Sequence, residues 1–243
     1  LADAQNENRG FGSNIYADRL RYRVEGGKLY VAVEARLDKT NNNGIAVFMR
    51  LSNLNGQGAA AGTSLGGVPS GGHLFGATAN PNFKNDFETH YAFVFNPGGS
   101  DSVVYIDAAK YTSTTKQGVY LGSCRMDGGA KQGPGPGSFF SENSITFAFD
   151  SAYGERRGLE IAFPLSELGN PAIADNISLF AVVVSSTAFF SDVTVPGNVT
   201  GGNPGFDVNW ANRPGGPYNT MPRGLPVELA AFTANSSGSS VIL

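Results

Sequence analysis

The sequence predicts an all-β protein, a single antiparallel, jelly-roll-like β-sandwich of about ten strands with long loops rich in Gly, Asn and Pro. Three observations favour this class. Apolar and polar residues alternate over many short segments, which is the period of a half-buried strand. The 33 glycines and 13 prolines supply turns between these segments. No helical period persists over an ordinary helix length, and a hydrophobic content of 41% is enough for one core.

The best-marked strand lies at residues 158–163, where every second residue is large and apolar. Pro164 cannot donate to a β-ladder, so pairing is expected to end there. Residues 165–168 are expected to form one helical turn, which Gly169 ends in a left-handed conformation. A strand that leads into a short cap is typical of the end of a sandwich.

The other strands show the same alternation and are separated by glycine or asparagine turns. Gly26 and Gly27 predict a two-residue hairpin turn. Residues 41–44 predict the next turn, because Asn and Gly tolerate positive φ. Residues 176–186 are nearly all apolar, which indicates a central strand buried on both faces. The predicted strands are residues 19–24, 29–37, 45–51, 90–96, 102–107, 118–121, 145–149, 158–163, 176–186 and 225–232.

One domain accounts for these strands. We expect a β-sandwich over residues 15–233, preceded by an arm or edge strand at 1–14 and followed by a flexible tail at 234–243. Three stretches without any period are expected to be long loops, residues 52–82, 127–138 and 196–222. Long loops in a compact domain are usually functional or mobile.

Charge and composition exclude several classes of partner. A net charge of −3 and a pI near 5.4 leave no basic field to hold nucleic acid or an anionic membrane. The longest apolar run, residues 179–184, is too short to span a bilayer. Cys124 is the only cysteine, so no internal disulfide can form, and we expect it to be a small buried side chain. The few lysines and the many polar loop residues favour an extracellular or cell-surface location.

Several motifs resemble a known family. Gly-Lys-Leu-Tyr-Val-Ala-Val at 27–33, Gly-Ile-Ala-Val-Phe-Met at 44–49 and Leu-Glu-Ile-Ala-Phe-Pro-Leu-Ser-Glu-Leu-Gly at 159–169 occur in that order. Together with Gly-Phe-Gly at 10–12 and an aromatic stretch at 86–91, they resemble secreted bacterial β-sandwich proteins similar to family-nine carbohydrate-binding modules and DOMON-like domains. The resemblance implies the sandwich fold and a glycan-binding role.

Oxygen donors gather in several predicted turns, and hard cations such as Ca²⁺ prefer such donors. None of these groups has the spacing of a known calcium loop, so solvated turn residues are the alternative interpretation. The resemblance implies a carboxylate near a calcium site at the end of the third strand, where this chain has Arg50. The candidate calcium ligands are Asp38, Asn41, Asn43, Asp86, Glu88, Asp192 and Asp207.

Aromatic residues in predicted loops are candidates for stacking on sugar rings, with packing over the ends of the sandwich as the alternative. These candidates are Trp210, Tyr218, Tyr153 and Phe139. The Asn-X-Ser/Thr pattern predicts glycosylation at Asn198 and Asn235. Asn176 also fits the pattern but begins a predicted buried strand.

We recognise no catalytic constellation in the sequence. His73 lies in a Gly-rich loop and His90 at the start of a strand, and neither has the partners of a nucleophile or base. Glu160 is expected to form an ion pair with one of the arginines at 19, 21 and 23 across the sheet. A ligand-binding role for Glu160 is the alternative to this ion pair. A glycosidase needs only two carboxylates, and such a pair is the enzymatic alternative for the whole chain. The expectation is a protein that is not an enzyme.

Two functions are expected from the sequence. The first is a structural, self-assembling surface or fibre subunit, in which the arm or an edge strand pairs with another copy of the chain. Head-to-tail contacts of this kind do not close and therefore give fibres. The second is a glycan-binding module of the cell surface, which the resemblance implies. The expected partners are the chain itself or an extracellular glycan, and calcium is the expected cofactor.

Overall fold

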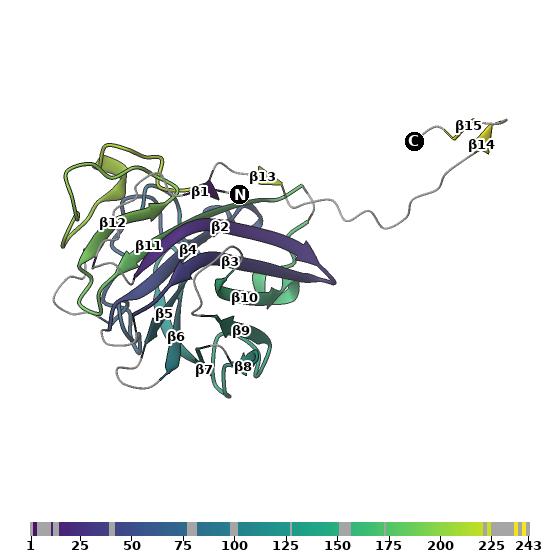
Figure 1. Cartoon of the computed structure of the whole chain (residues 1–243), viewed down its shortest axis with the longest axis horizontal. Coiled ribbons are helices and arrows are strands. Elements are labelled where there is room, and N and C mark those ends of the chain that lie inside the picture. Colours follow the sequence, from purple (N-terminus) through teal and green to yellow (C-terminus); the bar gives the residue numbers. More distant parts are fainter. Residues whose placement is uncertain are drawn as a thin grey trace.

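The computed structural model packs two β-sheets against each other (Figure 1). The predicted strand at 225–232, most of the arm at 1–14 and most of the tail at 234–243 lie outside the described residues. No helix of the described segments has the length and apolar character to cross a bilayer. The structure describes residues 2–3, 11, 15–38, 42–76, 82–97, 102–126, 128–150, 157–172, 174–220, 223–224, 236–237 and 240–241.

The described strands form the predicted all-β sandwich, and all its pairings within the sheets are antiparallel. Sheet A runs in the order β1 (Ala2–Asp3), β2 (Tyr16–Glu25), β3 (Lys28–Arg36), β10 (Gly158–Pro164), β9 (Ile145–Phe149) and β8 (Lys131–Gly133). Sheet B runs β12 (Phe190–Val195), β11 (Asn176–Val184), β4 (Gly44–Leu51), β5 (Tyr91–Pro97), β6 (Val103–Tyr111) and β7 (Lys116–Arg125), with β13 (Arg223–Gly224) beside β11.

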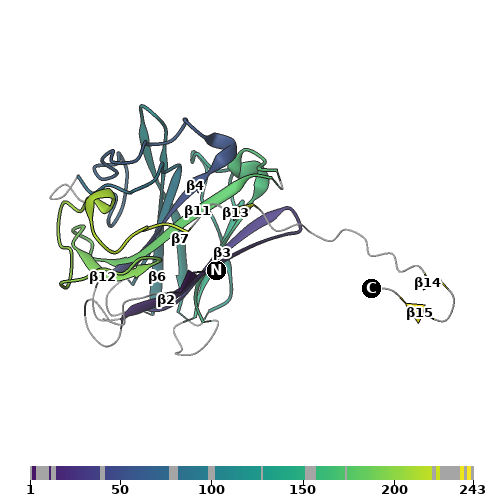
Figure 2. The same cartoon turned by 90° about the horizontal axis from the view of Figure 1, so that it is seen from above.

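The order of the strands explains how two sheets arise from one chain. Most neighbours along the chain form hairpins, and the chain changes sheet after β3, after β7 and after β10. Because β3 pairs antiparallel with β10 and β4 pairs antiparallel with β11, the connections β3–β4 and β10–β11 cross between the sheets at opposite ends of the sandwich. Figure 2 shows β2 and β3 in one layer and β4 and β11 in the other.

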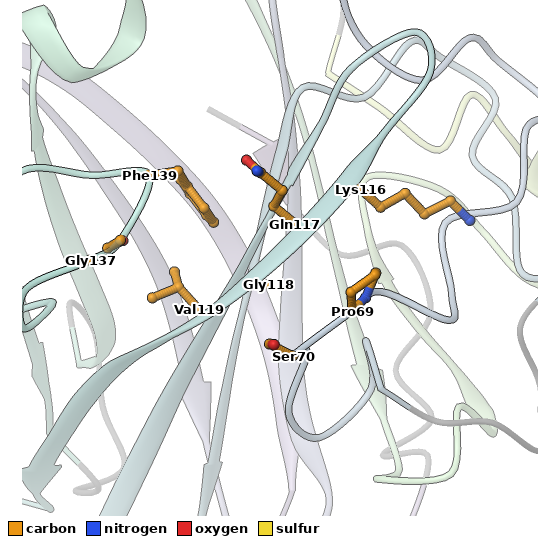
Figure 3. Close-up of a pocket in the computed structure, with 9 residues that line it drawn as sticks. Pro69, Ser70, Lys116, Gln117, Gly118, Val119, Gly137 and Phe139 are labelled. Carbon is orange, nitrogen blue, oxygen red and sulfur yellow. The ribbon is translucent and has the colours of Figure 1, made fainter.

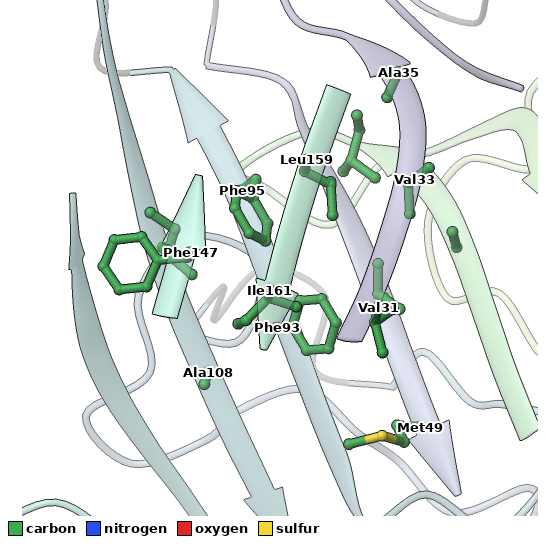
Figure 4. Packing of buried hydrophobic residues seen from close by; sticks show 14 of the residues in the cluster. Val31, Val33, Ala35, Met49, Phe93, Phe95, Ala108, Phe147, Leu159 and Ile161 are labelled. Atoms are coloured by element: carbon green, nitrogen blue, oxygen red, sulfur yellow. The ribbon is translucent and has the colours of Figure 1, made fainter. Parts of the chain in front are cut away.

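The main core fills the space between the two sheets. Figure 4 shows Val31, Leu159 and Ile161 from sheet A facing Phe93 and Phe95 from sheet B. These side chains are almost completely buried. They occupy alternate positions on each strand, so the apolar residues that recur with a period of two in the sequence form the inward face of the sandwich.

A layer of loops covers much of the outer face of sheet B and encloses a second core. Phe48 and Phe180 project outward from the sheet and contact aromatic rings of the loops, among them Phe83 and Trp210. The stretch 52–76 contains no strand, as predicted, but it packs as this third layer. The strand β11 is therefore buried on both faces, as its apolar sequence predicted.

Local signals in the sequence place several turns correctly. Gly26 and Gly27 both have positive φ, 56° and 72°, and join β2 to β3 by the predicted two-residue turn. The 3-10 helix η2 (Leu165–Leu168) follows β10, and Gly169 ends it in the left-handed region with φ of 74°. The other short helices of the described residues are η1 (Ser52–Leu54) and η3 (Trp210–Asn212).

Three sheet strands were not predicted, β8, β12 and the two-residue β13. The sequence of β12, Phe-Ser-Asp-Val-Thr-Val, does alternate, but polar residues in it are buried along with the apolar ones. Its outer face lies under the loop layer, which the sequence pattern could not show. Two further short strands, β14 (Ser236–Ser237) and β15 (Ser240–Val241), pair with each other.

Candidate functional site

An open groove of about 590 Å³ crosses the outward face of sheet A. On its floor, β10 places Glu160 between Ala32 of β3 and Ala148 of β9 in register. The two alanines leave space on either side of Glu160, and the longer side chains around them form walls.

Arginines of β2 line one wall of the groove. The carboxylate of Glu34 accepts a hydrogen bond from Nε of Arg21 at 2.9 Å and forms an ion pair with its Nη2 at 2.8 Å. Arg19 forms a longer ion pair with Glu34, at 3.6 Å. The guanidinium of Arg23 lies 4.8 Å from the centroid of the Tyr30 ring, which is a cation–π contact.

The predicted ion pair of Glu160 with these arginines is wrong. The structure pairs Arg19 and Arg21 with Glu34 instead, because the two-residue turn sets Arg19 opposite Glu34 and Arg21 opposite Ala32. The pairing of Arg19 with Glu34 could have been predicted from the sequence by counting residues along both strands from that turn. Glu160 is exposed on the groove floor, and the opposite wall carries Arg157 paired with Asp150 at 3.2 Å.

A second hollow, of about 400 Å³, lies at the free edge of β7 (Figure 3). The ring of Phe139, a predicted sugar-stacking residue, lines it together with Gln117 and Val119. Phe139 is only half-buried, but its ring also packs against Phe140, with centroids 4.7 Å apart. Of the four predicted sugar-stacking residues, it is the one that the described structure leaves at a hollow.

Trp210 and Tyr218 are not available for stacking on a sugar. Both are almost completely buried in the second core, and their rings lie 4.6 Å apart, each in contact with Phe180. The alternative interpretation, packing over the sandwich, therefore describes these two residues. Tyr153 lies outside the described residues.

The structure does not bring Asp86 and Glu88 together around a common cation. Asp86 accepts hydrogen bonds through Oδ2 from the backbone N–H of Tyr218 at 2.9 Å and from the side chain of Asn219 at 3.1 Å. Glu88 instead accepts from the backbone N–H of Gly58 at 2.9 Å and pairs with Arg50 at 3.6 Å. Both carboxylates thus fasten the loop layer to the rest of the domain.

The remaining predicted calcium ligands are dispersed. Asp192 is buried in β12, and its backbone N–H donates to the side chain of Asn203. Asp207 is exposed, with φ of 54°, and the antiparallel bridge between Phe190 and Gly205 carries it away from Asp192. Asp38 and Asn43 are half-buried and Asn41 lies outside the described residues. In the described segments no three His, Cys, Asp or Glu side chains converge.

The structure describes one of the two predicted glycosylation sites. Asn198 is exposed, in the loop layer, where its backbone N–H donates to the carbonyl of Gly215. Such a side chain is accessible to modification. Asn235 lies outside the described residues, and Asn176 is half-buried at the start of β11.

His90 has a structural environment. Its Nδ1 accepts from the backbone N–H of Leu51 at 3.1 Å, so the ring proton is on Nε2, which faces the carbonyl of Leu54 at 2.8 Å. Burial lowers the pKa of His90, although the carboxylate of Glu88, 3.3 Å from Nε2, opposes this effect. The neutral ring therefore connects η1 to the start of β5.

Two other groups lie away from these hollows, the half-buried His73 and the buried Cys124. Burial lowers the pKa of His73 to about 4, and its Nε2 lies 2.6 Å from the carbonyl of Asn42. Cys124 is buried in the main core, as expected, and burial raises the pKa of its thiol to about 11. A thiol in this state is not a nucleophile at neutral pH.

No protein-family model, curated protein or solved structure matches this chain. The resemblance to family-nine carbohydrate-binding modules and DOMON-like domains therefore remains an expectation. A sandwich can support many activities, so functional inference has to begin from the surfaces described above.

Proposed function

We propose that this chain is a non-enzymatic, extracellular glycan-binding module whose ligand lies in the groove on the outward face of sheet A. The observation that carries the proposal is the groove itself, whose volume of about 590 Å³ is that of a small-molecule site. Its open shape and the charged groups that line it suit an extended saccharide better than a compact apolar ligand.

The groups around the groove match the chemistry of a sugar. Glu160 stands between two alanines and offers carboxylate oxygens to sugar hydroxyls. Arg21 and Arg157 line the same groove and each keeps further N–H donors beyond those used in its ion pair. Tyr30 adds an aromatic wall. Hydroxyls both donate and accept, so a saccharide can satisfy carboxylate and guanidinium together.

Affinity gel electrophoresis with soluble xylan, mixed-linkage glucan and mannan tests the proposal. We expect at least one of these polysaccharides to retard the wild-type protein. Ala148→Phe fills the groove floor and should abolish retardation. Ala61→Phe places the same bulk on an exposed position of the loop layer and should have no effect. Equal migration of wild type with and without all three polysaccharides, or undiminished retardation of Ala148→Phe, would contradict the proposal.

A second candidate function, self-assembly into a surface layer or fibre, is supported by the edge of sheet A. The short strand β1 pairs with β2 through Ala2 opposite Leu20 and Asp3 opposite Arg19. Beyond this pairing, no described strand adds to residues 21–25 of β2 on the side away from β3. An edge that accepts one short segment can accept a strand from another copy.

Negative-stain microscopy tests this second function. We expect filaments or sheets of the wild-type protein and folded, unassembled particles after deletion of residues 1–14. Assembly that is unchanged by the deletion would refute a role for the arm. Single particles in the wild-type sample would leave glycan binding as the function.

A further inference from the structure

Two tyrosine rings lie exposed and side by side on the outer face of sheet B. Tyr105 of β6 is 37% exposed and Tyr120 of β7 is 48% exposed. Their ring centroids are 6.3 Å apart, and the ring planes are inclined by 37°. Among the described residues only Phe206, at 49%, is a comparably exposed large apolar side chain. An aromatic pair left in water by the loop layer indicates a contact surface.

The carboxyl group of Asp107 lies beside this pair. Asp107 is opposite Tyr120 in the register of β6 and β7, two positions along β6 from Tyr105. Only 9% of the surface of Asp107 is exposed. A side chain on Gly72 would collide with the carboxyl, so the glycine loop lies directly against it. Burial raises the pKa of Asp107 to about 6.

Asp107 receives no hydrogen bond from the part of the chain that the structure describes. This distinguishes it from Asp86 and Glu88, which both accept from backbone N–H groups. A nearly buried carboxylate without donors is unfavourable for folding. Its carboxylate oxygens are therefore open to hydrogen-bond donors of a ligand that lies on the neighbouring aromatic surface.

We propose that Tyr105, Tyr120 and Asp107 form a second saccharide-binding site, on the opposite side of the sandwich from the groove of sheet A. A sugar ring has an apolar C–H face, which can stack on tyrosine, and hydroxyl groups at its edge, which can donate to a carboxylate. A protein partner that covered the two rings would instead bury the charge of Asp107 unless it supplied a cation. A saccharide can stack on the two rings and donate hydrogen bonds to the carboxyl at the same time.

This inference takes its ligand class from the proposed function but uses different residues on a different sheet. Two sites on opposite faces make the module bivalent. Such a module can hold two glycan chains together, and simultaneous engagement strengthens binding to a polysaccharide beyond either site alone. The second site thus changes the expected role from simple attachment to cross-linking.

The test compares four proteins on the same xylan, glucan and mannan gels, and measures the turbidity of each polysaccharide solution. They are wild type, the groove variant Ala148→Phe, a double variant and the control Phe206→Ala. The double variant, Tyr105→Ala with Tyr120→Ala, removes both rings of the second site and is called the platform variant. The control removes an equally exposed ring elsewhere. A fifth protein, Asp107→Asn, keeps the shape of the site, and its melting temperature is recorded with those of the others.

We expect the platform variant to bind the retarding polysaccharide about tenfold more weakly than wild type, since one lost aromatic contact is enough for this effect. Turbidity should appear with wild type and Phe206→Ala and be absent with either site variant. Wild-type retardation and turbidity in the platform variant and in Asp107→Asn would overturn the second site while leaving the groove intact. Retardation of no protein by any polysaccharide would overturn both proposals.

Discussion

The replacement Asp107→Asn is expected to stabilise the fold at neutral pH. Asp107 is 9% exposed, and burial alone raises the pKa of its carboxyl from 3.8 to about 6. The native state therefore holds the proton of Asp107 more tightly than the unfolded chain does. Asparagine has nearly the same shape as the protonated acid but cannot ionise, so the substitution removes only the cost of the charge.

The size and sign of the effect follow from this difference in acidity. Burial makes the carboxyl a roughly hundredfold weaker acid, and each factor of ten corresponds to about 1.4 kcal/mol. The ionised group thus costs the native state about 3 kcal/mol at pH 7. The contribution of Asp107 to wild-type stability is fully present below pH 3.8 and is lost as the pH rises through about 6. Asp107→Asn removes that loss.

Urea unfolding of wild type and Asp107→Asn at pH 4 and pH 7 measures the effect. We expect nearly equal free energies of unfolding at pH 4 and an advantage of about 3 kcal/mol for the variant at pH 7, which corresponds to a rise of about 6–12 °C in melting temperature. Asp86→Asn is the matched control, because Asp86 accepts two hydrogen bonds. A variant that is no more stable than wild type at pH 7, or equally more stable at both pH values, would refute the reasoning.

Three further predictions concern the loop layer. Trp210→Ala should lower the free energy of unfolding by about 3–5 kcal/mol in urea, because the ring is buried against Phe180 and Tyr218; a loss below about 1 kcal/mol would mean that the layer is not packed. The pKa of His73 is lowered from 6.5 to about 4, so its contribution to stability is present above pH 6.5 and lost as the pH falls through about 4. His73→Gln should therefore flatten the acid limb of a pH titration of unfolding, and an unchanged limb would contradict this. Binding of calcium to loop oxygens should raise the melting temperature of wild type at millimolar calcium; no shift would remove calcium as a cofactor.

Much of the fold could be predicted because it depends on near neighbours. The alternation along β3 and β10 reports which side chains face inward. The paired glycines at 26 and 27 set both the turn and the register of β2 against β3. That register also contains the contact of Arg19 with Glu34, although we expected Glu160 as the partner. The error arose from pairing strands that are distant in sequence, where register is not specified locally.

The candidate sites were decided by tertiary structure. A polar-looking loop around Trp210 becomes part of a second core because sheet B presents Phe180 beneath it. Tyr105 and Tyr120 have the same alternation as buried aromatics on other strands, yet they remain exposed. The sequence alone determined the class of fold, the hairpin turn and the inward face of most strands, since these follow from periods of two and from glycine conformations. Which outward faces are covered by distant loops, and which stay open to a ligand, was decided only when the whole chain packed, because burial depends on segments that are far apart in sequence.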